Sequence, residues 1–198
     1  MKFDIPAGAR QVIQTLTAAG HEAYLVGGCV RDLLRGVEPH DWDICTSARP
    51  EETERCFAGQ RIIETGLKHG TVTVLVDGEP YEITTYRTEG PYSDNRRPDY
   101  VRFVPDLTED LARRDFTMNA IAMDLDGGLR DPFGGAGDIK ARLIRCVGEP
   151  DRRFQEDGLR VMRALRFAAV FGYEIEERTA RAVHENRAML DRVAAERI

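Results

Sequence analysis

Several features that would assign the chain to a specialised class are absent from its 198 residues. No apolar run is long enough to span a bilayer, and the first residues lack the hydrophobic segment of a secretory signal peptide. The four cysteines (Cys29, Cys45, Cys56 and Cys146) form no C-x-x-C pair, so neither zinc binding nor a disulfide framework is indicated. Internal repeats and low-complexity tracts are also missing. These absences favour a cytoplasmic protein with reduced thiols and no membrane segment.

The composition is that of an ordinary globular protein. Hydrophobic residues account for 42% of the chain and charged residues for 31%. A length of 198 residues suffices for one domain with a hydrophobic core, or for about one and a half small domains. The formal net charge of −6 argues against non-specific coating of nucleic acid but is compatible with a local basic groove. Basic residues are concentrated in the segments IKARLIR, DRRF and LRVMRALRF. They are either solvated charges on ordinary helices or contacts for RNA phosphates.

The hydrophobic pattern divides the chain near residue 148. Before that point it predicts strands at 22–28, 40–47, 71–76 and 81–87, and short strands near Leu129 and Ile144. It predicts helices at 12–19 and 29–36, a helix that starts at Pro50, and a helix over 107–124 that is broken near Asp115. Residues 88–98 are predicted to be a polar loop. After residue 148, helices are predicted over 150–171 and 177–190, and residues 191–198 begin a further helical pattern that predicts a chain cut from a longer one. The expected parts are a mixed α/β segment, residues 1–148, and a truncated all-helical segment, residues 149–198.

Gly27 and Gly28 lie between a predicted strand and a predicted helix. Glycines at such a point let a phosphate approach the backbone, and the start of a helix favours its negative charge. Arg31, in the first helical turn, has the planar guanidinium that clamps phosphates. The two glycines form neither a P-loop nor a dinucleotide-binding fingerprint, and a tight structural turn would account for them equally well. The segment is therefore a candidate phosphate site that needs a second feature in support.

Asp41 and Asp43 in HDWDIC supply that second feature. On a strand, residues two apart share a face, so these carboxylates would repel each other unless a cation lay between them. Two carboxylates on one face suit a pair of Mg²⁺ ions, which also bridge nucleotide phosphates. An isolated D-x-D is more often a solvated loop edge. Glu82, inside the predicted strand 81–87, is either a third carboxylate of this group or an outward-facing solvated residue.

Five segments, in order, resemble the motifs of one known family. GGCVRDLLRG, HDWDICTSARPEE, RRDFTMNAIAMD, DPFGG and EDGLRVMRALRF resemble those of the class II tRNA nucleotidyltransferases, which comprise CCA-adding enzymes, bacterial poly(A) polymerases and A- or CC-adding enzymes. The resemblance runs from about Tyr24 to the end of the chain. It implies an α+β fold, in which a polymerase-β-like nucleotidyltransferase head with a mixed β-sheet and flanking helices is followed by an all-helical neck. It also implies that Asp41 and Asp43 are catalytic and bind metal, and we extend the catalytic role to Glu82.

The segment EDGLRVMR places Glu156, Arg160 and Arg163 on one helical stripe, with Asp157 one turn before Arg160. For an anonymous helix, a salt-bridged surface is the ordinary interpretation. Cytosine and adenine, however, both present an amino donor beside a ring-nitrogen acceptor, whereas guanine and uracil present a carbonyl acceptor beside an N–H donor. An Asp that accepts and an Arg that donates therefore fit C and A. The resemblance assigns this templating role to Asp157 and Arg160, with Glu156 orienting the arginine.

The segment RRDFTMNA supplies Arg114, Asp115 and Asn119, whose side chains suit ribose hydroxyls. The resemblance implies that Arg114 and Asp115 line the nucleotide pocket and discriminate ribose from deoxyribose. The alternative is a helix-capping Asp beside a surface Arg. The loop TEGPYSDNRRPD corresponds to the flexible element that CCA- and A-adding members of the family keep and that CC-adding members shorten. Its presence argues for an enzyme able to add the terminal A.

The resulting prediction is a Mg²⁺-dependent nucleotidyltransferase that adds CMP and AMP to the 3′ end of tRNA and releases pyrophosphate. The expected partners are CTP, ATP and the tRNA 3′ end, and the tRNA is expected to bind weakly because the family's body and tail domains are missing. No protein partner is indicated. The closest alternative is a poly(A) polymerase or A-adding enzyme, and a more distant one is a non-catalytic nucleotide- or RNA-binding module.

Overall fold

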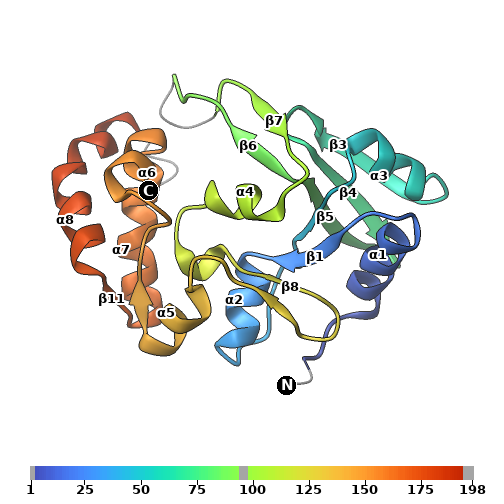
Figure 1. Cartoon of the computed structure of the whole chain (residues 1–198), viewed down its shortest axis with the longest axis horizontal. Helices are drawn as coiled ribbons and strands as arrows, with labels where there is room; N and C mark the ends of the chain where they lie inside the picture. Colours follow the sequence, from blue (N-terminus) through green and yellow to red (C-terminus); the bar gives the residue numbers. More distant parts are fainter. Residues whose placement is uncertain (1–2, 94–97, 194–198) are drawn as a thin grey trace.

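The computed structural model describes residues 3–93 and 98–193 of the chain (Figure 1). Within these ranges, seven strands form one sheet in the order β3-β4-β5-β2-β1-β8-β9. β2 and β5 are parallel and the other neighbours are antiparallel. The sheet is therefore the mixed one that was expected. Its strands are β1 (Ala23–Val26), β2 (Ile44–Thr46), β3 (Arg61–Gly66), β4 (Thr71–Val76), β5 (Glu79–Thr85), β8 (Ala122–Met123) and β9 (Leu129–Arg130).

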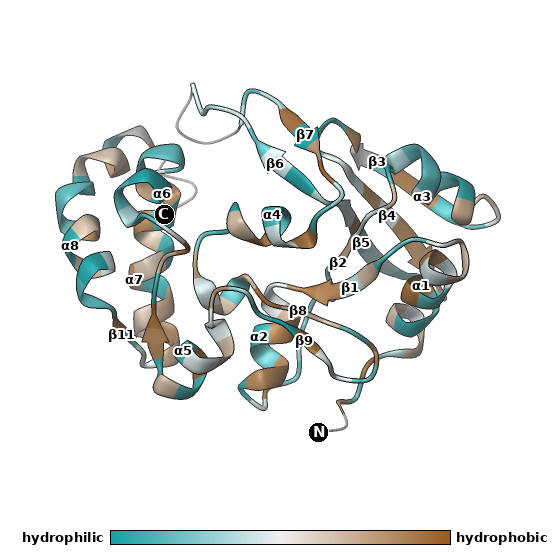
Figure 2. Ribbon diagram, viewed as in Figure 1, coloured by the Kyte–Doolittle hydropathy of each residue, from teal (hydrophilic) through white to brown (hydrophobic). Residues whose placement is uncertain are grey.

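Helices cover both faces of this sheet. Leu25 and Ile44 belong to a core with α1, whereas the next residues along the same strands, Val26 and Cys45, belong to a core with Leu111 of α4. This division follows from the alternation of side chains along a strand. Figure 2 shows that β1 is hydrophobic, whereas α8 is largely hydrophilic. The helices are α1 (Ala7–Ala18), α2 (Gly28–Leu34), α3 (Pro50–Cys56), α4 (Leu107–Ala112), α5 (Gly135–Ala141), α6 (Pro150–Glu156), α7 (Leu159–Phe171) and α8 (Glu177–Glu185), with 3₁₀ turns η1 (Leu67–His69), η2 (Thr117–Asn119) and η3 (Arg187–Arg192).

Elements with strong local signals form as predicted. α3 starts at Pro50, and the Glu52 carboxylate accepts a hydrogen bond from the backbone N–H of Arg49 at 2.8 Å, which caps the helix. β4 and β5 form the predicted hairpin through Asp77 and Gly78, both at positive φ (52° and 88°).

The predicted strand at 40–47 is shorter than expected, because regular pairing begins only at Ile44. Asp41 and Asp43 therefore precede the strand, and the expectation that they share a strand face is wrong. Asp43 is nevertheless tied to the sheet, since its carbonyl accepts a hydrogen bond from the N–H of Val26 at 3.0 Å.

The helix predicted over 107–124 is confirmed only for α4. Asp115 and Thr117 instead pair with the chain around Cys146: the N–H of Thr117 donates to the carbonyl of Arg145 at 2.9 Å, and the N–H of Val147 donates to the carbonyl of Asp115 at 3.0 Å. These hydrogen bonds join segments thirty residues apart, and they direct the chain into η2 and β8.

The long helix predicted over 150–171 is two helices, α6 and α7, separated at Asp157 and Gly158. A Cβ at Gly158 would lie 2.7 Å from the carbonyl oxygen of Met189, so η3 approaches the backbone where only glycine fits. Asp157 has extended backbone angles, and its carboxylate accepts a hydrogen bond from the N–H of Leu159 at 3.0 Å. Gly172 ends α7 in the left-handed conformation, as predicted.

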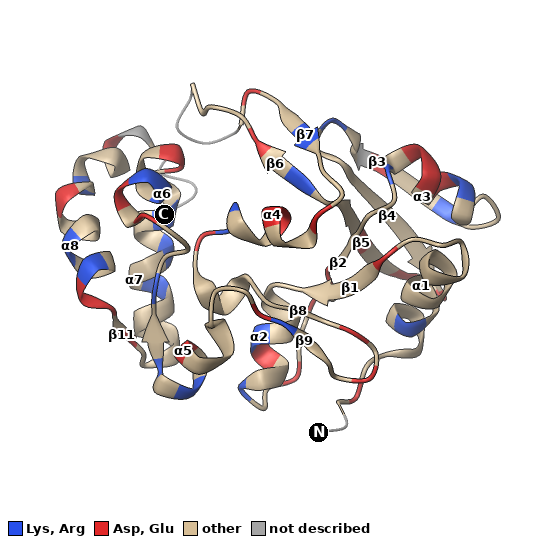
Figure 3. Cartoon of the chain, in the orientation of Figure 1, with Lys and Arg blue, Asp and Glu red and all other residues tan. Residues whose placement is uncertain are grey.

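The segment after residue 148 is predominantly but not entirely helical. α6, α7 and α8 lie together on the left in Figure 1, and Figure 3 shows acidic and basic residues interspersed along them. A short strand, β11 (Glu174–Ile175), pairs in parallel with β10 (Leu143–Ile144) from the preceding segment. The all-helical expectation is therefore wrong at β11, because the pairing partner comes from the other side of the predicted boundary.

Other elements carried no recognised sequence signal, namely β3, α5 and the ribbon of β6 (Arg87–Glu89) and β7 (Val101–Phe103). The ribbon contains the first residues of the predicted loop at 88–98, and positions 94–97 of that loop lie outside the described residues. So does most of the helical pattern at 191–198. In the described ranges, no helix is both long and apolar enough to cross a membrane.

Candidate active site

A cleft of about 780 Å³ opens between the turn after β1, the segment after α4, and α7. It is lined by all of the predicted site residues except Glu82 and Glu156: Gly27, Gly28, Arg31, Asp41, Asp43, Arg114, Asp115, Asn119, Asp157, Arg160 and Arg163. These residues come from positions 27 to 163, so the fold gathers into one cavity what the sequence distributes over most of its length.

The glycine turn has a backbone that only glycine adopts easily. Gly27 has φ 77° and ψ −126°, and a Cβ there would lie 3.0 Å from Nη1 of Arg114. Arg31, one turn into α2, donates from Nη1 to Oδ1 of Asn119 at 2.9 Å and lies over the ring of Phe167 at 5.4 Å. The turn therefore offers an open backbone flanked by two anchored guanidinium groups.

The three predicted carboxylates line one hollow beside the cleft, and two of them, Asp41 and Asp43, also line the cleft. Burial raises the pKa of Asp43, the charges of Glu82 and Asp41 raise it further, and the charge of Arg114 opposes them. The hollow that the three acids line has a volume of about 390 Å³. The repulsion anticipated from the sequence is therefore present between these acids.

Carboxylate oxygens are the donors that hard divalent cations prefer, and a cation would counteract both the burial and the like charges that raise the pKa of Asp43. Asp41 and Asp43 thus fit a divalent metal ion. Within the described ranges, no three or more His, Cys, Asp and Glu side chains are arranged to hold a metal. Glu82 is consequently not placed as a third ligand, and further ligands would have to be substrate phosphates or water.

Asp115, which lines the cleft, is held by a set of hydrogen bonds. Arg163 donates to its Oδ2 at 2.7 Å, whereas Asn119 and the N–H of Phe116 donate to Oδ1 at 3.0 and 2.8 Å. Burial alone would raise the pKa of Asp115, but the Arg163 charge and these hydrogen bonds outweigh it and keep the pKa below its usual value. Asp115 is therefore an anchored carboxylate rather than a solvated helix cap.

Arg160, near the start of α7, is buried and extensively hydrogen-bonded. Its Nη1 donates to Oε2 of Glu156 at 2.8 Å and to the carbonyl of Arg153 at 3.3 Å, and its Nη2 donates to the Tyr92 hydroxyl at 3.4 Å and the carbonyl of Arg113 at 3.3 Å. The contact with Glu156 is the one that an orienting role requires. Asp157 lies in the break between α6 and α7, so the predicted stripe on one helix is wrong, although Glu156 and Arg160 do form a pair.

Sequence reasoning did not single out several cleft residues, including Arg87, Glu89, Tyr92, Arg113 and Phe167. Tyr92 has no local signal, because it meets Arg160 only through the fold. Asp110 was also missed, although its spacing of three and four residues from Arg113 and Arg114 on a predicted helix could have indicated ion pairs.

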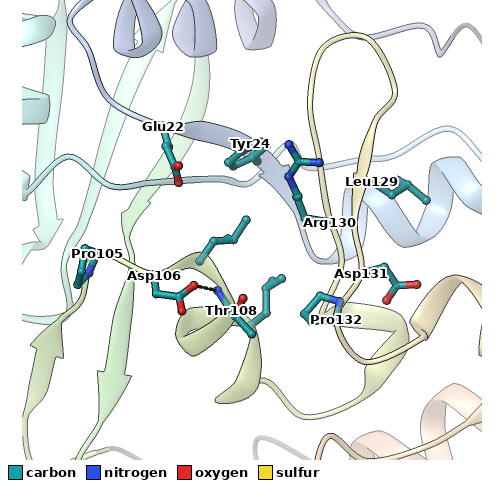
Figure 4. A pocket seen from close by; sticks show the side chains of 11 residues that line it. Glu22, Tyr24, Pro105, Asp106, Thr108, Leu129, Arg130, Asp131 and Pro132 are labelled. Atoms are coloured by element: carbon teal, nitrogen blue, oxygen red, sulfur yellow. Dashed lines mark hydrogen bonds between the residues drawn. The ribbon is translucent and has the colours of Figure 1, made fainter.

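A separate hollow of about 470 Å³ lies between β1, the start of α4 and β9, and it contains none of the predicted site residues (Figure 4). Arg130 faces the ring of Tyr24, with its guanidinium carbon 5.9 Å from the ring centre. The Asp106 carboxylate accepts a hydrogen bond from the N–H of Thr108 at 2.7 Å and is thus occupied in capping α4.

The fold is that of a polymerase-β-like nucleotidyltransferase head with a mixed sheet and flanking helices. Residues 23–145 match the model of the Poly A polymerase head domain, and the chain belongs to that family. Membership implies a divalent metal ion at the site.

Among its relatives, the chain is 54% identical over 195 residues to a CCA-adding enzyme of Lactobacillus helveticus, covering 98% of this chain and 48% of that protein. It resembles the crystal structure of the Bacillus stearothermophilus CCA-adding enzyme in complex with CTP, with a TM-score of 0.87, 47% identity, and coverage of 96% of this chain and 45% of that one. It also resembles a tRNA nucleotidyltransferase complexed with a primer tRNA and an incoming ATP analog (TM-score 0.74, 31% identity, 94% of this chain and 53% of that one). The chain therefore spans about half the length of the relatives it matches.

Proposed function

We propose that this chain carries the nucleotide-transfer site of a CCA-adding enzyme, which adds CMP and AMP from CTP and ATP to the 3′ end of tRNA with release of pyrophosphate. The observation that carries the proposal is the cleft itself. It holds the two acids Asp41 and Asp43 together with Asp157 and Arg160, in a chain 54% identical to a CCA-adding enzyme.

The residues of the cleft have separate roles in metal binding and triphosphate binding. Asp41 and Asp43 would hold Mg²⁺, which when bound favours ionisation of the attacking 3′ hydroxyl and neutralises the triphosphate. The Gly27–Gly28 turn admits the triphosphate beside Arg31 and Arg114. The 3′ oxygen of the tRNA attacks the α-phosphorus, the bond to the β-phosphate oxygen breaks, and pyrophosphate leaves.

Base and sugar are read at the other end of the cleft. Asp157 accepts from the exocyclic amino group of C or A, and Arg160 donates to the adjacent ring nitrogen. Glu156 keeps the guanidinium of Arg160 in place through the 2.8 Å ion pair. Asp115, anchored by Arg163, faces the ribose. We place this reaction in the cytoplasm, in line with four cysteines that all fall in the described ranges and are all free thiols.

The test is incorporation of labelled nucleotide into a tRNA that lacks its CCA end, with CTP and ATP supplied singly and together. Three added residues that require both nucleotides support the proposal. A long ladder with ATP alone would indicate a poly(A) polymerase, and a single A added only to a tRNA ending in CC would indicate an A-adding enzyme.

The same assay tests the site. Asp41→Ala and Asp43→Ala should abolish incorporation while the protein stays folded, and Glu82→Ala decides whether the third acid takes part. Glu51→Ala, an exposed acid on α3, is the control that should leave incorporation unchanged. A version extended to the length of the relatives should be run beside this chain, because this chain covers 48% of the Lactobacillus helveticus enzyme.

A further inference from the structure

Asp110 is a fully buried carboxylate on α4, with an exposed fraction of 0%. It accepts three hydrogen bonds: from the backbone N–H of Arg87 at 3.1 Å, from Nε of Arg113 at 3.0 Å and from Nη2 of Arg114 at 3.2 Å. Burial alone would raise its pKa, but the charges of Arg113 and Arg114 and the Arg87 N–H outweigh burial and keep the pKa below its usual value. Asp110 is therefore charged at neutral pH although it is out of contact with water.

All three partners of Asp110 line the cleft, whereas Asp110 itself does not. Arg113 has a second anionic partner in Glu89, at 2.8 Å, whereas Arg87 contacts Asp110 only through its backbone N–H and pairs its guanidinium with Glu89 at 3.3 Å. For Arg114, the ion pair found within the described ranges is the one with Asp110. The position of the Arg114 guanidinium consequently depends more on Asp110 than that of the other two does.

Arg114 reaches from Asp110 to the front of the cleft. Its Nη1 lies 3.0 Å from the point where a Cβ of Gly27 would be, so it is packed against the glycine turn. Arg114 and Asp43 line the same cleft. The guanidinium of Arg114 therefore contacts Asp110 through Nη2 and the glycine turn through Nη1.

We propose that Asp110 is a positioning residue for nucleotide binding: it holds Arg114 against the Gly27 turn and thereby sets the affinity of the cleft for CTP and ATP. The inference rests on the proposed function and adds a residue to it. Asp110 does not contact the substrate and acts through Arg114. The backbone N–H of Arg87 and the side chain of Arg113 also donate hydrogen bonds to Asp110.

The experiment is equilibrium binding of CTP and steady-state incorporation by the full chain and by Asp110→Asn. Asn has nearly the same shape but lacks the charge, so the hydrogen bond from Arg114 weakens. Hydrogen bonds to charged groups imply a loss of roughly ten- to a hundredfold in CTP affinity. The change should appear in KM, with a much smaller change in kcat.

A double-mutant cycle separates positioning from general destabilisation. In an Arg114→Gln background, Asp110→Asn should produce no further loss of CTP affinity, because its effect passes through Arg114. Asp138→Asn is the matched control. Asp138 is also buried and accepts from Thr117 at 2.6 Å and Arg145 at 3.1 Å, but it lies outside the cleft, so its variant should lower Tm and leave KM unchanged.

Should Asp110→Asn fail to fold, Asp110→Glu keeps the charge and moves it by one methylene, and it should raise KM to a smaller extent. Unchanged CTP affinity in a folded Asp110 variant would overturn the inference, and so would additive losses of affinity in the double-mutant cycle. The proposed function would remain intact in either case, provided that Arg114→Gln alone weakens CTP binding. A parent chain that neither binds CTP nor incorporates it would overturn the proposed function itself.

Discussion

Arg163 of α7 donates from Nε to Oδ2 of Asp115 at 2.7 Å, and this contact joins the two parts of the chain that the hydrophobic pattern separates at residue 148. β10 and β11 pair across the same boundary. The cleft is therefore built jointly by both parts, and the placement of α7 against the segment after α4 decides its geometry. A boundary near residue 148 remains a prediction about how the chain divides, not a description of independent units.

The Asp115–Arg163 contact predicts a dependence of stability on pH. The pKa of Asp115 is below its usual value of about 4 in the folded state. Its contribution to stability is therefore complete above about pH 4 and is lost as pH falls through the folded-state value. Because the Arg163 side chain is partly exposed, Arg163→Gln should destabilise the protein by about 1–2 kcal/mol at neutral pH, and the difference from the parent should shrink as pH falls through the folded-state pKa of Asp115. The measurement is the urea-unfolding midpoint between pH 3 and pH 7.

The control for this experiment is Arg178→Gln. Arg178 forms an ion pair of similar length with Glu149, at 2.9 Å, but both side chains are exposed. Exposed pairs contribute about 0–1 kcal/mol, so this variant should behave nearly as the parent does. Identical pH profiles for the two variants would contradict the role given to Asp115.

Gly27 and Gly36 form a matched pair for testing the glycine turn. Both have positive φ (77° and 72°), but a Cβ at Gly27 would meet Arg114, whereas a Cβ at Gly36 would meet nothing within 4 Å. Replacement by Ala should destabilise both variants through the strained backbone, and Gly27→Ala the more, because its ψ of −126° lies outside the left-handed region. Only Gly27→Ala should also lose CTP affinity in an equilibrium titration. An equal loss of affinity in both would show that the turn acts through stability alone.

Arg160 and Asp157 are predicted to select the base. A well-made bidentate contact to a base is worth about 1–3 kcal/mol of discrimination, so removing one partner should relax selection by roughly ten- to a hundredfold. Arg160→Ala and Asp157→Ala should raise the relative use of UTP and GTP, chiefly by weakening CTP and ATP. The measurement is incorporation efficiency for all four nucleotides.

Arg181→Ala, on the exposed side of α8, is the control for base selection. If both variants in the cleft keep the parent's preference for C and A, these side chains do not form the template. The ion pairs around Arg160 would then serve stability only.

The four cysteines should differ sharply in reactivity. Burial raises the pKa of Cys29 to about 11 and that of Cys146 to about 12, and Cys45 is also buried with a raised pKa. Burial also raises the pKa of Cys56, but this side chain is only half-buried and so is more accessible to reagent. Since the thiolate is the reactive form, native protein at pH 8 should react with iodoacetamide at Cys56 faster than at the other three by on the order of 100-fold. Peptide mass spectrometry after a timed pulse measures this, and protein unfolded in urea should be modified at all four.

Local patterns were sufficient for elements whose signals lie within a few residues. The hairpin of β4 and β5 follows from two alternating segments around Asp77 and Gly78, and the start of α3 follows from Pro50 with two glutamates after it. The carboxylates could be grouped with the glycine turn because their chemistry is characteristic whatever the backbone does. The prediction that Asp41 and Asp43 share a strand face was wrong, because β2 starts only where its residues pair with β1, at Ile44.

The break between α6 and α7 shows the limit of a helical pattern. Residues 150–171 have an almost continuous amphipathic period, yet the carbonyl of Met189 approaches Gly158 and Asp157 leaves the helix. The strand-like pairing of Asp115 and Thr117 with the chain around Cys146 likewise replaces a predicted helix. In both places a contact between distant segments outweighs a propensity of a few tenths of a kcal/mol per residue.

The sequence by itself determined which chemical groups are available: two acids beside a glycine turn, and an acid and an arginine suited to C and A. Only the tertiary structure decided which of them share one cavity and what holds each in place. Arg114 is fixed by the buried Asp110, Asp115 by Arg163, and Arg160 by Glu156 and Tyr92. The reason is physical. Residue types and spacing specify what a side chain can donate or accept, but the partner that satisfies a buried charge is chosen by the packing of segments far apart in the chain.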